Sequence, residues 1–404
     1  MPTYIPQLWA ARTVLAAIQD DDDVPAVPVA ADAIEIFDAG PPSLEANFVE
    51  MKTIRPYMGA APKVTTNVHR STDMAVGLSG SGAAGTAPGW DTLMRCCSFA
   101  ATAITGAATI QASPGTAGGG NAGTMNYVKG AAYAGSDDRV VTITVTGAGA
   151  SGVAVVTISA PASLRHDAHN QAGVVVTDGQ ALALVGGATI LPTIGAALDV
   201  GDVWTVTLTA PAVIYTPVSE GFEMATLHYH IDGQRRRFMN ARGAMTALSL
   251  AAGAVPKIGY GIKGSWEAPT ATARPAADFS RFRHPIPLSK TNTPRGRLFG
   301  RDLVISSIEL KVAEPAVHRD VINHRGTMID DRTMSGQIKF DLPPLADWDI
   351  ESAVVNHDRG ALEFEHGHTA GNIIRVTAPS VQLAGKPAYA KGEGGATEVT
   401  IDLT

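Results

Sequence analysis

Residues 215–266 constrain the fold more than any other stretch, because extended runs follow one another there with very short connections. Within 226–231, polar and apolar residues alternate, as they do in a strand with one buried face. Asp232-Gly233 then forms the residue pair that favours a two-residue hairpin turn, because such a turn needs positive φ angles. We expect the chain to return through 234–239 as the next strand.

The remainder of this stretch predicts two more strands. We expect a turn near 241–243, a strand over 245–250, a break at Gly253 and Pro256, and a last strand through 258–262. The whole stretch is therefore predicted to be an antiparallel meander. No catalytic residue pattern lies on it.

Composition supports a β-rich chain and excludes several classes of function. The 404 residues include 42 Gly and 25 Pro, and only 17% are charged, which favours short strands and turns in two or three domains. A net charge of −7 argues against a protein that clamps nucleic acid by neutralising phosphates. Cys96 and Cys97 are adjacent, which is poor geometry for a disulfide with each other. We find no signal peptide at Met1 and no apolar run of about 18 residues, so we expect folding in a reducing cytoplasm and no membrane association.

Before the meander we expect two helices and several strands. Leu8, Ala11, Leu15 and Ile18 recur at helical spacing, and the carboxylates of 20–23 are expected to end that helix as a solvated loop, with metal binding as the weaker reading. Trp90 and its apolar neighbours predict a second helix, with Thr86 as its cap, Pro88 in its first turn and Cys97 on its buried face. The predicted strands of this region are 33–37, 47–54, 63–69 and 73–78.

Residues 102–214 have a different composition and are predicted to form an inserted domain. Charge nearly disappears there, and 112–124 reads as a Gly-rich connector. Four strand signals follow at even intervals, at 140–146, 153–159, 173–177 and 203–209. This spacing is typical of a small immunoglobulin-like β-sandwich.

Residues 286–404 repeat the earlier pattern. The run at 303–312 resembles the strand near 33–37, and the alternation at 338–342 resembles that at 74–78. Proline and a tryptophan helix follow each of the two alternating runs, with Trp90 in the first copy and Trp348 in the second. Strand signals then follow at 361–366, 372–383 and 398–403. The chain is thus predicted to be mainly β, with a discontinuous first lobe of 1–101 and 215–285, the insertion 102–214, and a second lobe of 286–404.

Two H-x-H pairs are the strongest candidates for chemistry. His228 shares a strand face with His230, and His366 does so with His368, near Glu363 and Glu365. Such pairs could bind a metal if their strands met, but alternate polar residues also occur on any half-solvated strand.

The arginines of 235–237 could meet phosphate, but consecutive residues of a strand point to opposite faces, so pairing with carboxylates of a neighbouring strand or subunit is favoured. We therefore expect no catalytic residue, no metal and no cofactor.

The order of these features resembles that of the major tail tube proteins of long-tailed (siphovirus-type) bacteriophages. The resemblance rests on DAIEIF, on GLSGSGAAGTAPGWDTLMRCC, on the meander IDGQRRRFMNARGAMTALSLAAGAVPKIGYGIKGSW, and on DDRTMSGQIKFDLP and HGHTAGNIIRVTAPSVQL. It covers most of 5–100 and 215–404. Many relatives have a single tube lobe, so the doubled pattern resembles the fused type with two lobes in one chain.

The resemblance implies a structural virion protein and not an enzyme. Three chains would form a pseudo-hexameric ring, with a hexamer as the alternative, and rings would stack into the tail tube, assembled in the host cytoplasm. DNA would pass through the lumen without specific binding, and the tape measure, tail terminator and distal tail proteins would be partners. Two alternatives stay open: a secreted carbohydrate-binding β protein, and a metal-dependent β-barrel protein that uses the H-x-H pairs.

Overall fold

A computed structural model describes residues 11–22, 24–51, 54, 61–106, 108–111, 123–313 and 316–404. The chain is mainly β, as predicted, with two short α-helices, α1 (Asp91–Arg95) and α2 (Ile350–Val355). The strands outside the insertion are β1 (Arg12–Gln19), β2 (Ala33–Ile34), β3 (Asp38–Ala39), β4 (Ser43–Glu50), β5 (Lys63–Gly77), β6 (Phe99–Ile104), β15 (Ala212–Pro217), β16 (Met224–Ile231), β17 (Gln234–Ala251), β18 (Lys257–Trp266), β19 (Thr270–Ala271), β20 (Arg295–Leu298), β21 (Arg301–Asp302), β22 (Ile305–Ala313), β23 (Ala316–Val321), β24 (His324–Ile329), β25 (Thr333–Asp341), β26 (Arg359–His366), β27 (Ile374–Lys391) and β28 (Thr397–Leu403).

Sixteen strands form one large sheet in which the same order of six strands occurs twice. The first set runs β1-β16-β17-β18-β5-β4, and the second runs β20-β26-β27-β28-β25-β22. Helix α1 follows β5 along the chain, and α2 follows β25 in the same way. The repeat that the sequence predicts is therefore present in the strand topology. One detail differs from the prediction. The strand at 303–312, which is β22, corresponds to β3 and β4 in the first set and not to residues 33–37.

The two sets are joined by a short ladder between β17 and β22, where Leu248–Ala251 pair with Ser307–Leu310 in antiparallel register. One hydrophobic cluster extends across both sets, from Val14 and Leu93 to Trp348 and Leu403. This shared core means that the two sets pack as one body in a single chain. Their assignment as two lobes stays a prediction.

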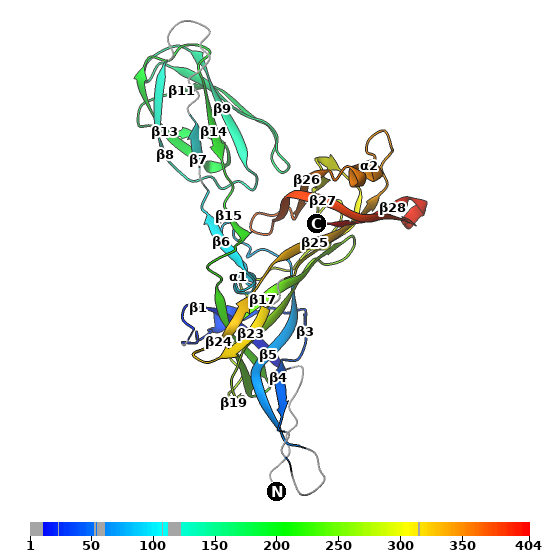
Figure 1. Cartoon of the computed structure of the whole chain (residues 1–404). Coiled ribbons are helices and arrows are strands. Elements are labelled where there is room, and N and C mark those ends of the chain that lie inside the picture. Colours follow the sequence, from blue (N-terminus) through cyan, green and yellow to red (C-terminus); the bar gives the residue numbers. More distant parts are fainter. Residues whose placement is uncertain are drawn as a thin grey trace.

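The insertion has its own sheets and its own core (Figure 1). Its strands are β7 (Ala108–Gln111), β8 (Thr124–Lys129), β9 (Arg139–Gly147), β10 (Val155–Ala160), β11 (His169–Val175), β12 (Leu182–Ala183), β13 (Thr189–Ala196) and β14 (Val203–Leu208). A two-stranded ribbon of β6 and β15 connects it to the main sheet, with Ile104 directly opposite Ala212. The ends of the insertion are therefore adjacent in space. Its immunoglobulin-like class stays a prediction.

Several sequence predictions of local structure were wrong. The second helix begins at Asp91 with Trp90 as its N-cap, so Thr86 is not its cap and Pro88 lies before it. The helix expected from Leu8 to Ile18 is strand β1 over its described part, which pairs with β16 and β2. Consecutive residues of β1 are buried, so the strand lacks the alternation of a half-exposed strand. The turn expected near 241–243 is a bulge inside the continuous strand β17, where Asn240 adopts a φ of 48°. The strands expected at 63–69 and 73–78 are one strand, β5. Strands β7, β8, β12 and β13 of the insertion were not predicted.

Candidate subunit interface and sheet surface

The first H-x-H pair lies on β16 and is buried. The rings of His228 and His230 meet edge to face with centroids 6.2 Å apart. Burial, and after it the charge of Arg235, lowers the pKa of His228 to about 4, and the same causes lower the pKa of His230. Both imidazoles are therefore neutral near pH 7. Because Arg235 and Arg237 flank them on β17, the local field repels a metal cation.

In the second pair, His366 is buried at the end of β26 and is used in hydrogen bonding, whereas His368 lies beyond the strand and is exposed. Both ring nitrogens of His366 have partners, the carbonyl oxygen of Ile286 at 3.0 Å and the hydroxyl of Thr293 at 3.0 Å. The carboxylate of Glu365 is buried and bound by Arg165 and Arg375. Among the described residues, no group of three or more His, Cys, Asp or Glu side chains is placed to hold a metal.

Neither the arginines of 235–237 nor the described acidic residues of 20–22 form a ligand site: Arg237 pairs with a carboxylate, and the acidic residues lie in an exposed bend. The Arg237 guanidinium binds Glu267 with two hydrogen bonds, the longer from Nη2 to Oε1 at 2.5 Å. Glu267 immediately follows β18, the strand beside β17, so the predicted pairing with a carboxylate is confirmed for Arg237. Asp20, Asp21 and Asp22 form an exposed bend after β1, and Asp23 lies outside the described residues.

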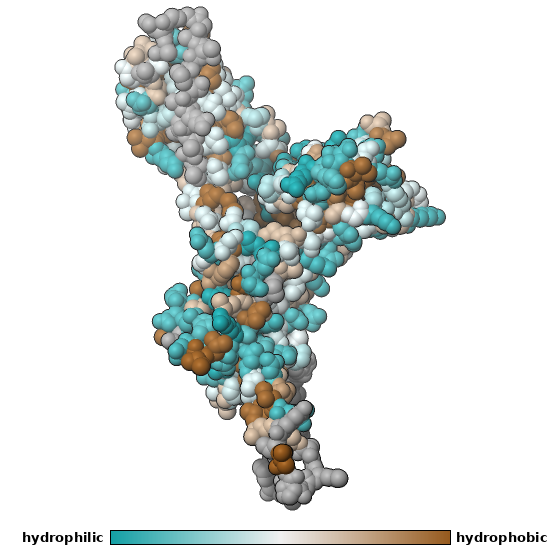
Figure 2. Space-filling model, viewed as in Figure 1, coloured by the Kyte–Doolittle hydropathy of each residue, from teal (hydrophilic) through white to brown (hydrophobic). Residues whose placement is uncertain are grey.

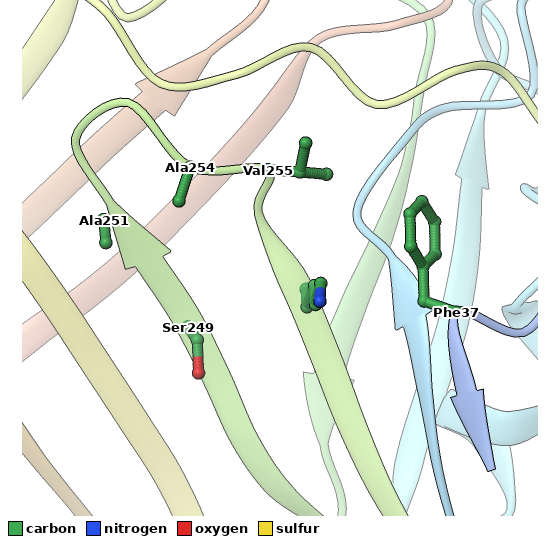
Figure 3. A pocket seen from close by; sticks show the side chains of 6 residues that line it. Phe37, Ser249, Ala251, Ala254 and Val255 are labelled. Carbon is green, nitrogen blue, oxygen red and sulfur yellow. The ribbon is translucent and has the colours of Figure 1, made fainter.

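A shallow hollow of about 460 Å³ lies beside the tip of the β17–β18 hairpin (Figure 3). Phe37 lines one side, Ser249 and Ala251 line another, and Ala254, Val255 and Lys257 complete it. Its reactive groups are one hydroxyl and one ammonium group, and no carboxylate or imidazole lies among the lining residues to act as a base. The hollow therefore has no residue pair for nucleophilic or acid–base catalysis.

The two faces of the large sheet differ in character. On β18, Ile258, Tyr260 and Ile262 point into the core, whereas the residues between them are Gly259 and Gly261. The same alternation occurs on β25, where Ile338 and Phe340 are buried and their neighbours are polar. One face is thus the hydrophobic core, and the other is a surface of small and charged side chains.

Charges on this polar face pair with one another. The Lys339 ammonium lies 2.5 Å from Glu398, and Glu398 also accepts a hydrogen bond from Ser306 at 2.6 Å. These contacts hold the pKa of Glu398 below its usual range, with Lys339 as the main cause. The ammonium of Lys311 lies 3.1 Å from Glu309 on β22. On these strands, therefore, the basic groups lie beside acids that offset their charge.

Open strand edges are the second feature of the large sheet. Within the described part of the chain, β3 and β4 pair only with β5, and β27 beyond Gln382 pairs only with β28. These edges carry unpaired backbone groups that can form ladders with another chain. The sequence did not predict which strands form these edges, because strand order depends on contacts between distant residues.

The β4–β5 hairpin projects from the body of the molecule and carries exposed apolar side chains (Figures 1 and 2). Leu44 is 57% exposed, Phe48 65%, Val49 55% and Val64 47%. A cluster of this kind on a protruding hairpin is typical of a surface that is covered by a partner.

The insertion is fixed to the second strand set by a buried charge cluster. Arg165 of the insertion binds Asp137 of the same domain at 2.6 Å and contacts Glu365 of β26. The Arg165 Nη2 also donates to the carbonyl oxygen of Gly367 at 2.8 Å. Burial raises the pKa of Asp137, but the hydrogen bonds from Arg165 and Ser163 outweigh burial and lower it overall. The insertion is therefore anchored at a second point besides its two-stranded ribbon.

No family model and no curated protein matches this sequence. No helix in the described part of the chain is both long enough and apolar enough to cross a membrane.

Proposed function

We propose that this protein is a structural subunit that assembles into closed rings, which stack into the tail tube of a long-tailed bacteriophage. The observation that carries the proposal is the repeated six-strand order, together with two edges that have no strand partner among the described residues, one at β3 and β4 and one along β27 beyond Gln382. Inside the chain, the β17–β22 ladder already joins one repeat to the next. A second junction of the same kind between chains would extend the sheet, and a fixed rotation at each junction would close it into a ring.

The expected ring has a wide channel. Eight strands lie between the open edges, in the order β3-β5-β18-β17-β22-β25-β28-β27. Three chains would therefore supply about 24 strands. With a spacing of about 4.8 Å and a tilt of about 40°, such a barrel is roughly 48 Å across between backbones. Barrels with fewer strands already enclose aqueous channels.

The polar face suits the inner wall of such a channel. The opposite face is occupied by the hydrophobic core and its helices, so the polar face is the one left for the lumen. Its paired acids and bases, exemplified by Lys339 and Glu398, together with the net charge of −7, disfavour binding of DNA phosphates. The tube would therefore guide DNA without holding it. The insertion would lie outside, and the β4–β5 hairpin would reach the adjacent ring.

This function has no catalytic residue, cofactor or metal. Its partners are other copies of the chain and the other tail proteins: the tape measure in the lumen, the terminator and the distal tail protein at the ends. Its location is the virion tail, after assembly in the host cytoplasm.

Electron microscopy of the purified full-length protein tests the proposal. We expect rings at low concentration and tubes at high concentration, with a central channel. A protein that stays monomeric at high concentration under varied salt and pH would contradict it. Metal analysis of the same preparation serves as a control: a stoichiometric bound metal would support the metal-dependent alternative.

A further inference from the structure

The junction between the two strand sets provides a template for a second junction. In the first set, Val76 of β5 lies opposite Ile258 of β18, and Ile258 lies opposite Leu248 of β17. Beyond Leu248, the strand β17 pairs with β22, where Leu250 lies opposite Ile308. The ladder begins just after a bulge at Met245, so its position along β17 is well defined.

The second set contains an equivalent row of paired residues across its three corresponding strands. Phe340 of β25 lies opposite Val399 of β28, and Val399 lies opposite Tyr389 of β27. A register shift again precedes this point, between Ala384 and Ala388. Tyr389 thus holds the place of Leu248. Two residues further on, Lys391 holds the place of Leu250.

The partner edge is found in the same way. In the second set, Ile308 lies opposite Ile338 of β25. In the first set, Ala39 of β3 lies opposite Met74 of β5, the counterpart of Ile338. Ala39 therefore holds the place of Ile308, and its outer side has no strand partner among the described residues.

We propose that β27 of one copy pairs with β3 of the next copy, with Lys391 directly opposite Ala39 of that copy. This inference rests on the proposed ring and gives it a register. In this antiparallel register, Gly392 lies opposite Asp38 of the next copy, and Ala390 lies opposite Gly40 of that copy. The occupant of each open edge is thus a second copy of this chain, in a head-to-tail contact.

Backbone directions at both edges agree with this pairing. The Gly392 N–H donates to Ala396 on the β28 side, so by alternation the Lys391 N–H and C=O point to the open side. The Ala39 carbonyl also points outward, where it accepts a hydrogen bond from Arg12 Nη1 at 3.1 Å. A carbonyl oxygen has two lone pairs, so it can accept the Lys391 N–H as well.

Prolines limit the ladder to this short stretch. Pro41 follows the paired residues of β3 and has no N–H to donate, and Pro387 precedes those of β27. The in-chain template is equally short, since it covers Leu248–Ala251 only. The expected contact is therefore a ladder of about three residue pairs, supported by side-chain packing around exposed Tyr389.

Cysteine cross-linking of the full-length chain tests the register. The variant carrying Ala39→Cys and Lys391→Cys should form disulfides between chains on mild oxidation, giving dimers and trimers on a denaturing gel. The matched control, Ala39→Cys with Lys386→Cys, uses another exposed lysine of β27 five residues away and should stay monomeric on the gel. The natural cysteines, Cys96 and Cys97, are buried.

The outcomes separate this inference from the proposed function. Rings or tubes that form without the Ala39–Lys391 cross-link overturn the register and leave the tube intact. Failure of the natural chain to form any ring overturns the tube, and the edge pairing with it. If the cysteine variants do not assemble, cryo-electron microscopy of rings of the natural chain decides: Lys391 opposite Ala39 of the next copy supports the register, and any other pairing at this junction overturns it.

Discussion

The two strand sets share one topology but differ in what covers the outer edge of their longest strand. In the first set, β22 covers the end of β17, and the contact is made within one chain. In the second set, the equivalent end of β27 is open among the described residues. The junction at β17 therefore forms within one chain, whereas the equivalent junction at β27 is available to a second molecule.

The sets also differ in what their connecting segments do. Between α1 and β16 the first set carries the whole insertion, whereas α2 leads directly into β26 in the second. Between β22 and β25, the second set has the hairpin β23–β24, which packs on β17 and β18 of the first set through hydrogen bonds of Asn240 and Arg242 to its backbone. Extra segments have been added at different loops, while the paired strands are kept.

The tryptophans at equivalent places should contribute equally if the sets are true counterparts. Trp90 donates from Nε1 to Ser79 O at 2.8 Å, and Trp348 stacks on Phe340 with centroids 6.0 Å apart. We expect Trp90→Ala and Trp348→Ala each to lower the free energy of unfolding by about 3–5 kcal/mol, as large-to-small core changes do. Chemical denaturation measures this.

The control for the tryptophan variants is Val355→Ala, because Val355 is 74% exposed at the end of α2 and should cost under about 0.5 kcal/mol. A large loss for one tryptophan and none for the other would break the equivalence of the two sets.

Acid should weaken the contact between the sets. His318 of β23 stacks on His69 of β5 at 5.0 Å, and burial, followed by the charge of His69, lowers the pKa of His318 to about 4. The unfolded chain protonates this imidazole below about pH 6.5, but the folded chain does so only near pH 4. Stability is therefore lost as pH falls between these values, by about 3 kcal/mol for this group.

Denaturation at pH 7 and pH 4 tests this, with His318→Gln as the comparison because glutamine keeps a polar side chain without titrating. The variant should lose about 3 kcal/mol less than the natural chain over this range. Equal losses would mean that His318 does not couple pH to the contact.

Removal of the insertion should have the smallest effect on assembly. Because Ile104 and Ala212 are opposite each other in the β6–β15 ribbon, a short Gly/Ser bridge can replace residues 104–212. We expect rings of the same copy number by electron microscopy. A second deletion that also carries Glu365→Gln avoids leaving a buried carboxylate without Arg165. Loss of assembly in both deletions would give the insertion a role in the ring.

Local patterns predicted the elements better than their pairing. The Asp232-Gly233 turn was predicted from the residue pair, and in the structure both residues adopt a positive φ, 31° and 81°. Strand β1 was misread because it is buried on both sides, which leaves no period of two. Pairing between chains was predicted, but the strands that make it were not, since the edges at Ala39 and Lys391 become visible only once the order of the strands is known.

The number of chains in one ring decides whether one chain supplies two consecutive parts of the ring, and cryo-electron microscopy of the assembled full-length protein can count it. We expect three chains, each contributing two similar strand sets around the channel, with six insertion-equivalent positions of which three carry a domain. Six full-length chains in one ring would contradict this expectation, because the ring would then contain twelve strand sets and not six.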